Sequence, residues 1–101
     1  MKDQIAKNIE KGKIIPGMNT LEAAKAGGAY FFRVIADESV WGKDADPYLV
    51  IQAQAEHPDN SRIWMTFQND TQYSGRGIQT FQVRFEKGLV VDIVNLTKET
   101  L

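Results

Sequence analysis

The chain has 101 residues, with 12 basic and 13 acidic side chains, one histidine and no cysteine. A chain of this length is expected to form one domain, residues 1–101, and to bury roughly 60–65% of the surface that its unfolded form exposes. The lack of cysteine excludes disulfides, thiolate zinc sites and a cysteine nucleophile. A net charge of −1 with dispersed lysines and arginines argues against nucleic-acid binding and against attraction to an anionic membrane.

The apolar runs of the chain bear on its compartment. None approaches the ~20 residues that a membrane-spanning helix requires. Residues 1–11 lack the apolar segment of a signal peptide. We therefore expect a cytoplasmic protein, or a periplasmic one if a leader has been removed.

Two short helices are expected at the start of the chain. Residues 2–11 carry isoleucines at positions i and i+4, which give the first helix a narrow apolar stripe. The second begins after Asn19, because Asn19 and Glu22 have the spacing of a capping box. It ends at Gly27, since glycine is favoured just beyond a helix C-terminus.

Five strands are expected after the helices. Residues 29–36 are apolar on nearly both sides, which favours a covered strand. Residues 48–56 and 62–68 alternate in a way that predicts one hairpin, and residues 78–96 predict a second. The order ααβββββ indicates an α+β two-layer sandwich, with two short helices on one face of a mainly antiparallel five-stranded sheet.

The last hairpin allows its register to be predicted. A three-residue loop, 86–88, with Gly88 at positive φ in a G1 bulge, puts the apolar residues of both arms on one face. Loops of two or four residues mix the faces. The expected pairs, on the face that the two helices should cover as a core, are Phe85/Leu89, Val83/Val91 and Phe81/Ile93.

The second face of the predicted sheet has the composition of an interface. Solvated strand faces favour lysine, glutamate and threonine, whereas this face has glutamine, aromatic residues and arginine. We expect it to bind a protein partner or a second copy of the chain, as a homodimer. The alternative is that residues 37–47 fold back and Trp41 covers Trp64 within one chain. The residues of this predicted interaction face are Tyr48, Gln52, Gln54, Trp64, Thr66, Gln68, Gln82 and Arg84.

No group of residues predicts catalysis or metal binding. His57 lies near Asp59 and Ser61, but residues two apart in one tight loop do not converge on an attack point, and turn chemistry explains them. The acidic residues within 37–46 do not match an EF-hand loop. Residues 74–77 lack phosphate-loop spacing. We expect no catalytic residue, no metal and no cofactor.

The competing hypothesis is a small-molecule-binding protein or a minor enzyme. Its pocket would lie between the helices and the sheet, with apolar aromatic walls and an arginine as the polar anchor, which is the usual make-up of a ligand site. The expected lining residues are Tyr30, Arg33, Trp41, Tyr73 and Arg76.

Two stretches resemble a known family. Residues 15–28, IPGMNTLEAAKAGG, resemble the G-M-T-x-x-E-V…G opening of the SmpA/OmlA family of small outer-membrane lipoproteins, and residues 81–93, FQVRFEKGLVVDI, are similar to its last hairpin. The resemblance spans about a quarter of the chain and would imply a periplasmic assembly or scaffold role. The chain has no lipidation cysteine, and its expected strands outnumber the three of that family, so the resemblance is used here for shape alone.

Overall fold

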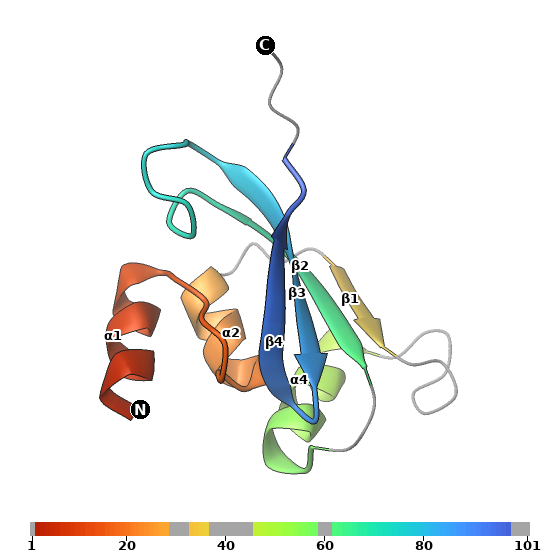
Figure 1. Ribbon diagram of the computed structural model, residues 1–101. Helices are drawn as coiled ribbons and strands as arrows, with labels where there is room; N and C mark the ends of the chain where they lie inside the picture. Colours follow the sequence, from red (N-terminus) through yellow and green to blue (C-terminus); the bar gives the residue numbers. More distant parts are fainter. Residues whose placement is uncertain (1, 29–32, 37–45, 59–61, 98–101) are drawn as a thin grey trace.

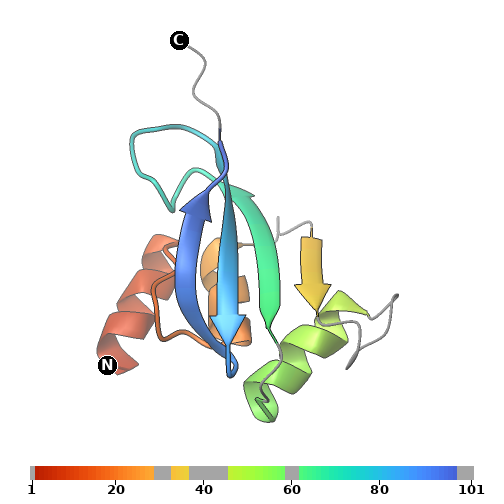
Figure 2. The ribbon, with the colours of Figure 1, turned by 45° about the vertical axis from the view of Figure 1, so that its right-hand side comes forward.

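The computed structural model describes residues 2–28, 33–36, 46–58 and 62–97, with the backbone alone for Lys2 and for 33–36. The sheet is antiparallel, in the order β1-β2-β3-β4. Figure 1 shows α2 between α1 and β4, and Figure 2 shows α2 behind β3 and β4. In chain order the elements are α1 (Lys2–Lys11), α2 (Thr20–Gly27), β1 (Arg33–Ala36), α4 (Pro47–Glu56), β2 (Ile63–Asn69), β3 (Gln79–Glu86) and β4 (Leu89–Asn95).

The core lies between the helices and one face of the sheet. Strand β3 alternates along its whole length between buried and half-buried residues, as its apolar alternation predicted. The rings of Phe67 and Phe81 stack with their centroids 5.6 Å apart. The side chains of this core are Ile14, Met18, Ala23, Ala26, Val50, Ile51, Ile63, Met65, Phe67, Phe81, Val83, Phe85 and Val90. We call the side of the sheet that contributes to this core the inner face.

Helix α2 begins and packs as predicted. The Asn19 side chain accepts a hydrogen bond from the Glu22 N–H at 2.8 Å, and the Glu22 carboxylate accepts one from the Asn19 N–H at 2.9 Å. This is a complete capping box. Gly27 is buried against the Phe67 ring, so closely that a Cβ at this position would overlap it. Small residues therefore let α2 lie close on the sheet.

The prediction of two helices and five strands is wrong, although the α+β class is confirmed. Residues 47–56 form helix α4, and the described residues contain four strands. The cause lies at the start of the segment. The Asp46 carboxylate accepts a hydrogen bond from the Tyr48 N–H at 2.9 Å, and Pro47 occupies the first turn, where its fixed φ suits a helix. Val50, Ile51 and Gln54 are buried, which is helical spacing.

Because 47–56 is a helix, the predicted hairpin between 48–56 and 62–68 does not form. Strand β2 instead pairs with β1 on one side and β3 on the other, with Met65 opposite both Val34 and Val83. Helix α4 packs beside α2, and the Thr20 hydroxyl donates a hydrogen bond to the Ile51 carbonyl oxygen. The helices thus share the inner side of the sheet.

The last hairpin exists, but its predicted three-residue loop is wrong. Glu86 pairs with Leu89, so the loop has two residues, Lys87 and Gly88. Their φ angles are 53° and 76°, as a type I′ turn requires. Its backbone twist matches that of the strands, which is why hairpins favour it.

A β-bulge in β4 restores the inner face that the shorter loop would have disrupted. Phe85 pairs with Val90 and Arg84 with Asp92, which leaves Val91 as the extra residue. Val90, rather than Leu89 or Val91, is therefore the buried residue at this end of the strand, and Leu89 and Val91 are 46% and 42% exposed. The predicted core positions of Leu89 and Val91 are wrong for this reason.

The connector between α1 and α2 covers one end of the β4 edge. The Gly17 N–H donates to the Val90 carbonyl oxygen at 3.0 Å, and the Val90 N–H donates to the Met18 carbonyl oxygen at 2.8 Å. Further along the strand, the Asp92 carboxylate accepts a hydrogen bond from the Ile93 N–H at 3.0 Å. This arrangement occupies backbone groups that an exposed edge strand would otherwise offer to another chain.

The same connector is attached to the β2–β3 loop by side chains. The Gln72 amide accepts a hydrogen bond from the Ile14 N–H at 2.7 Å and donates one to the Ile14 carbonyl oxygen at 2.9 Å. The Thr71 hydroxyl donates to the Gly12 carbonyl oxygen at 2.7 Å. The Gln72 side chain therefore hydrogen-bonds both backbone groups of Ile14, as a neighbouring strand would.

Candidate protein-interaction surface

The face of the sheet opposite the helices is the candidate functional surface, and we call it the outer face. Five of the eight residues predicted for the interaction face lie together on β2 and β3, in adjacent register. Trp64 is half-buried and Thr66 is 7% exposed, so β2 is better covered than β4. The five residues are Trp64, Thr66, Gln68, Gln82 and Arg84.

The other three predicted residues do not belong to this face, because they lie on α4. Tyr48 and Gln52 are exposed, and the Gln52 side chain donates to the Glu56 carboxylate at 3.2 Å. Gln54 is buried beneath the helix. Their predicted place beside Trp64 and Thr66 depended on a strand that does not exist.

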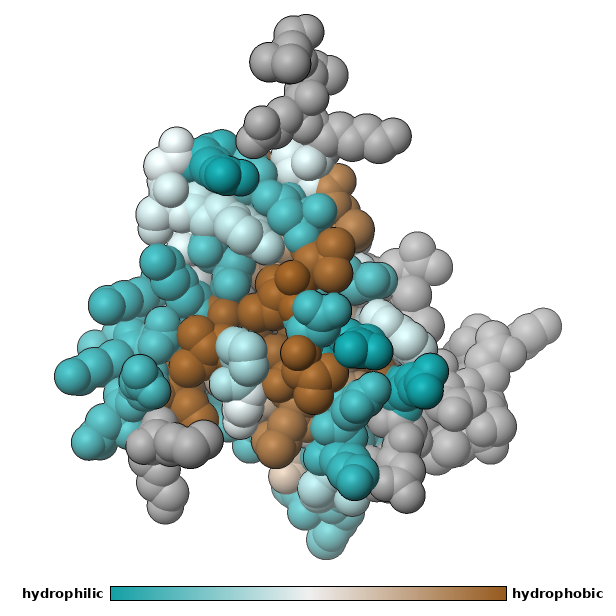
Figure 3. All heavy atoms as spheres, in the orientation of Figure 1, coloured by the Kyte–Doolittle hydropathy of each residue, from teal (hydrophilic) through white to brown (hydrophobic). Residues whose placement is uncertain are grey.

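Four apolar side chains on and just after β4 form a strip, and none of them is among the eight residues predicted for the interaction face. Each is between 42% and 47% exposed. Figure 3 shows the corresponding hydrophobic band over β4. Of the other large exposed apolar residues, Leu21 lies on α2, Tyr48 and Leu49 lie on α4, and Ile78 directly precedes β3. We call the four residues the β4 strip: Leu89, Val91, Val94 and Leu96.

Two of these residues, Leu89 and Val91, had been assigned to the core. The signal that could have placed them outside is the Lys87-Gly88 pair, since a two-residue turn with glycine second is a frequent hairpin connection. The two-residue turn predicts the observed register only together with the β-bulge at Val91, and the alternation of β4 does not indicate that bulge.

Charged groups of both signs flank the β4 strip. The Arg84 guanidinium lies 3.6 Å from the Glu86 carboxylate, and its Nε–H is buried without a hydrogen-bond partner among the residues that the structure describes. Asp92 is directly opposite Arg84 in the register, yet the two form no ion pair among the described residues. An arginine carries five N–H donors, and the Arg84 side chain is 41% exposed, so its terminal N–H groups are accessible on the outer face.

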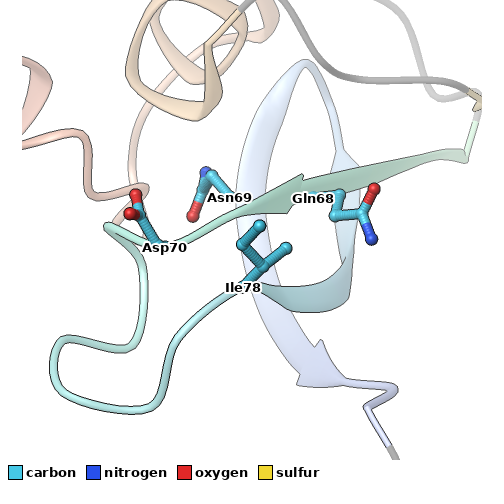
Figure 4. Close-up of a pocket in the computed structure, with 4 residues that line it drawn as sticks. All are labelled: Gln68, Asn69, Asp70 and Ile78. Atoms are coloured by element: carbon cyan, nitrogen blue, oxygen red, sulfur yellow. The ribbon is translucent and has the colours of Figure 1, made fainter.

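A hollow of about 440 Å³ lies where β2 passes into the β2–β3 loop, lined by Gln68, Asn69, Asp70 and Ile78 (Figure 4). Asn69 is already used by the fold. Its amide donates to the Gly27 carbonyl oxygen at 3.0 Å and accepts from the N–H of Gln72 at 2.9 Å. In Figure 4, Ile78 lies between Gln68 and the other two polar side chains. Three of its four described lining residues are polar, in contrast to the mainly apolar lining of a typical ligand site.

The residues predicted to line a pocket are only partly described. Tyr30 and Trp41, including the predicted cover of Trp64 by Trp41, lie outside the described residues. The backbone of Arg33 pairs with Thr66 in the sheet. The pocket that these residues would line therefore stays a prediction.

Tyr73 and Arg76, the remaining predicted pocket residues, share the β2–β3 loop. The Arg76 N–H donates to the Tyr73 carbonyl oxygen at 3.3 Å. The Tyr73 ring meets the Phe81 ring edge-on at 5.8 Å. Burial raises the pKa of the Tyr73 phenol, and the nearby Arg76 charge opposes this shift. Tyr73 therefore extends the core, whereas Arg76 is exposed.

The remaining sequence candidates gain no catalytic geometry from the described residues. His57 is exposed and follows the last turn of α4, where its backbone N–H donates to the Ala53 carbonyl oxygen at 2.7 Å. Asp59 and Ser61 lie outside the described residues. Across the described ranges, no three carboxylate, histidine or cysteine side chains gather as metal ligands would. None of the described helices has the length and apolarity needed to span a bilayer.

Comparison with known proteins returns no relative for this chain: no family model, no curated protein and no solved structure matches it.

Proposed function

We propose that this protein is a non-enzymatic interaction module that binds a protein surface through the β3–β4 half of the outer face. The observation that carries the proposal is the β4 strip, in which four apolar side chains are each between 42% and 47% exposed. Removing apolar surface from water contributes about 25 cal/mol per Å². Contiguous exposed apolar patches bordered by polar groups are a mark of interaction sites.

The neighbours of the strip on β3 support the same function. Thr80, Gln82 and Arg84 are half-buried and supply hydrogen-bonding groups next to the apolar side chains. Arginine is enriched at interfaces because its planar guanidinium can donate several hydrogen bonds and pack flat at the same time. An apolar strip beside such a row matches the pattern of an interface with an apolar centre and a polar border.

Site-specific photo-crosslinking in living cells tests the proposal. A photoreactive amino acid is placed at Val94 in the strip, or at Leu21 on α2 as a matched control, because both side chains are exposed and apolar. We expect protein adducts, either of a second copy or of another protein, at position 94 and few at position 21. Equal yields at both positions, or none at either, would overturn the proposal.

A further inference from the structure

We infer that the protein bound at the outer face is a second copy of this chain, packed face to face about a two-fold axis. The axis runs parallel to the strands, between β3 and β4. This inference rests on the proposed function and adds the identity of the partner. Three observations carry it: the register of the hairpin, the charges beside the β4 strip and the size of the face.

The register of the hairpin determines which residues would meet. Within one chain Arg84 is opposite Asp92, and Gln82 is opposite Val94. A two-fold axis parallel to the strands and midway between β3 and β4 places each strand over the other without shifting it along its length. Arg84 of one copy then faces Asp92 of the second, and Gln82 faces Val94. Because a two-fold interface is isologous, each contact occurs twice.

The charges favour this position of the axis. The Arg84 side chain is 41% exposed, and its one ion-pair contact among the described residues is long, at 3.6 Å from the Glu86 carboxylate. Among the described residues, the carboxylate of Asp92 accepts one hydrogen bond, from the neighbouring Ile93 N–H. Arg84 therefore has donors to give, and Asp92 has an oxygen to accept them. An axis directly over β4 would instead bring Asp92 against its own copy, and like charges across an interface are unfavourable.

The size of the face predicts how tightly the copies bind. Strands β2, β3 and β4 have 7, 8 and 7 residues. At about 3.3 Å per residue and ~4.8 Å between strands, they span a face of about 25 Å by 15 Å. A standard interface buries ~800 Å² per partner, and the flat area of this face is less than half of that, in the range of weak and transient interfaces. We therefore expect a dimer that dissociates on dilution.

The dissociation constant of the purified chain tests the inference. Sedimentation velocity, from micromolar to near-millimolar chain, should show a reversible monomer–dimer equilibrium. Val94→Lys places a charge in the strip and should raise the Kd at least about tenfold, which corresponds to 1.4 kcal/mol. Leu21→Lys is the matched control, because Leu21 is similarly exposed on α2, and it should leave the Kd unchanged.

A charge exchange tests the axis itself. Arg84→Glu alone puts two acidic groups in each contact, and Asp92→Arg alone puts two basic groups there, so each variant should be monomeric by itself. Mixed together they place opposite charges in both contacts, and a heterodimer should form. Recovery on mixing cannot be produced by variants that fail to fold.

The outcomes separate the inference from the proposed function. A wild-type chain that stays monomeric, together with crosslinks from position 94 to a different protein, overturns the second copy but keeps the interaction module. A monomer without crosslinks overturns both. A dimer that is indifferent to Val94→Lys, and single charge variants that do not recover on mixing, overturn the inference by placing the interface elsewhere.

Discussion

Strand β3 alternates between two environments from one residue to the next. On the inner face Phe81, Val83 and Phe85 are fully buried, whereas Gln82 and Arg84 between them remain partly open to solvent. The inner residues are constrained by the volume around them, because protein interiors are packed as densely as organic crystals. The outer residues satisfy no such constraint. Polar capacity that the fold does not use, as at Arg84, is therefore found on the outer face.

Substitutions at two neighbouring residues of β3 should show the largest difference between the faces in their effect on the free energy of unfolding. Phe81→Ala leaves a cavity beside the stacked ring of Phe67 and should lower the free energy of unfolding by about 3–5 kcal/mol. Gln82→Ala, one residue away on the outer face, should change it by less than about 0.5 kcal/mol. Urea denaturation of the two variants measures the difference, and comparable losses would break the distinction between the faces.

A smaller effect is expected where α2 touches the inner face. Gly27→Ala forces a methyl group into the Phe67 ring and should cost about 1–3 kcal/mol, as overpacking does. Lys25→Ala, on the exposed side of the same helix, is the control and should have little effect. Thermal and urea unfolding of the two variants measure the difference in stability. An unchanged stability for Gly27→Ala would mean that α2 lies further from the sheet.

The smallest effect concerns the turn that decides which face each β4 residue occupies. Lys87 has a φ of 53°, and Asn tolerates this region better than Lys. Lys87→Asn should therefore raise the free energy of unfolding, by up to about 1 kcal/mol. Lys87→Val should lower it, since β-branched residues disfavour positive φ. A three-residue loop would place Lys87 at negative φ, and Asn would then bring no gain.

Local patterns with a single physical cause could be predicted from the sequence. The capping box at Asn19 and Glu22 depends on residues three apart, and the inner face of Phe81, Val83 and Phe85 follows from strict alternation. The β2 and β3 members of the predicted interaction face, such as Trp64 and Gln82, were placed together because their strands were assigned correctly.

Patterns with two competing causes could not be resolved in the same way. Alternating apolar residues from Leu49 to Ala55 favoured a strand, but the Asp46-Pro47 start fixes a helix, and the burial of Gln54 follows from that helix. The bulge at Val91 leaves no mark in the alternation of β4. For this reason the sequence predicts core positions for Leu89 and Val91, two of the four residues of the β4 strip.

The paired hydrogen bonds between the Gln72 amide and the backbone of Ile14 couple the local unfolding of two segments. They join segments 58 positions apart in the sequence, so release of the α1–α2 connector removes hydrogen bonds that also hold the β2–β3 loop. Regions linked in this way exchange their amide hydrogens as one cooperative unit. Helix α1 and the loop should therefore open together, while the central strands stay closed.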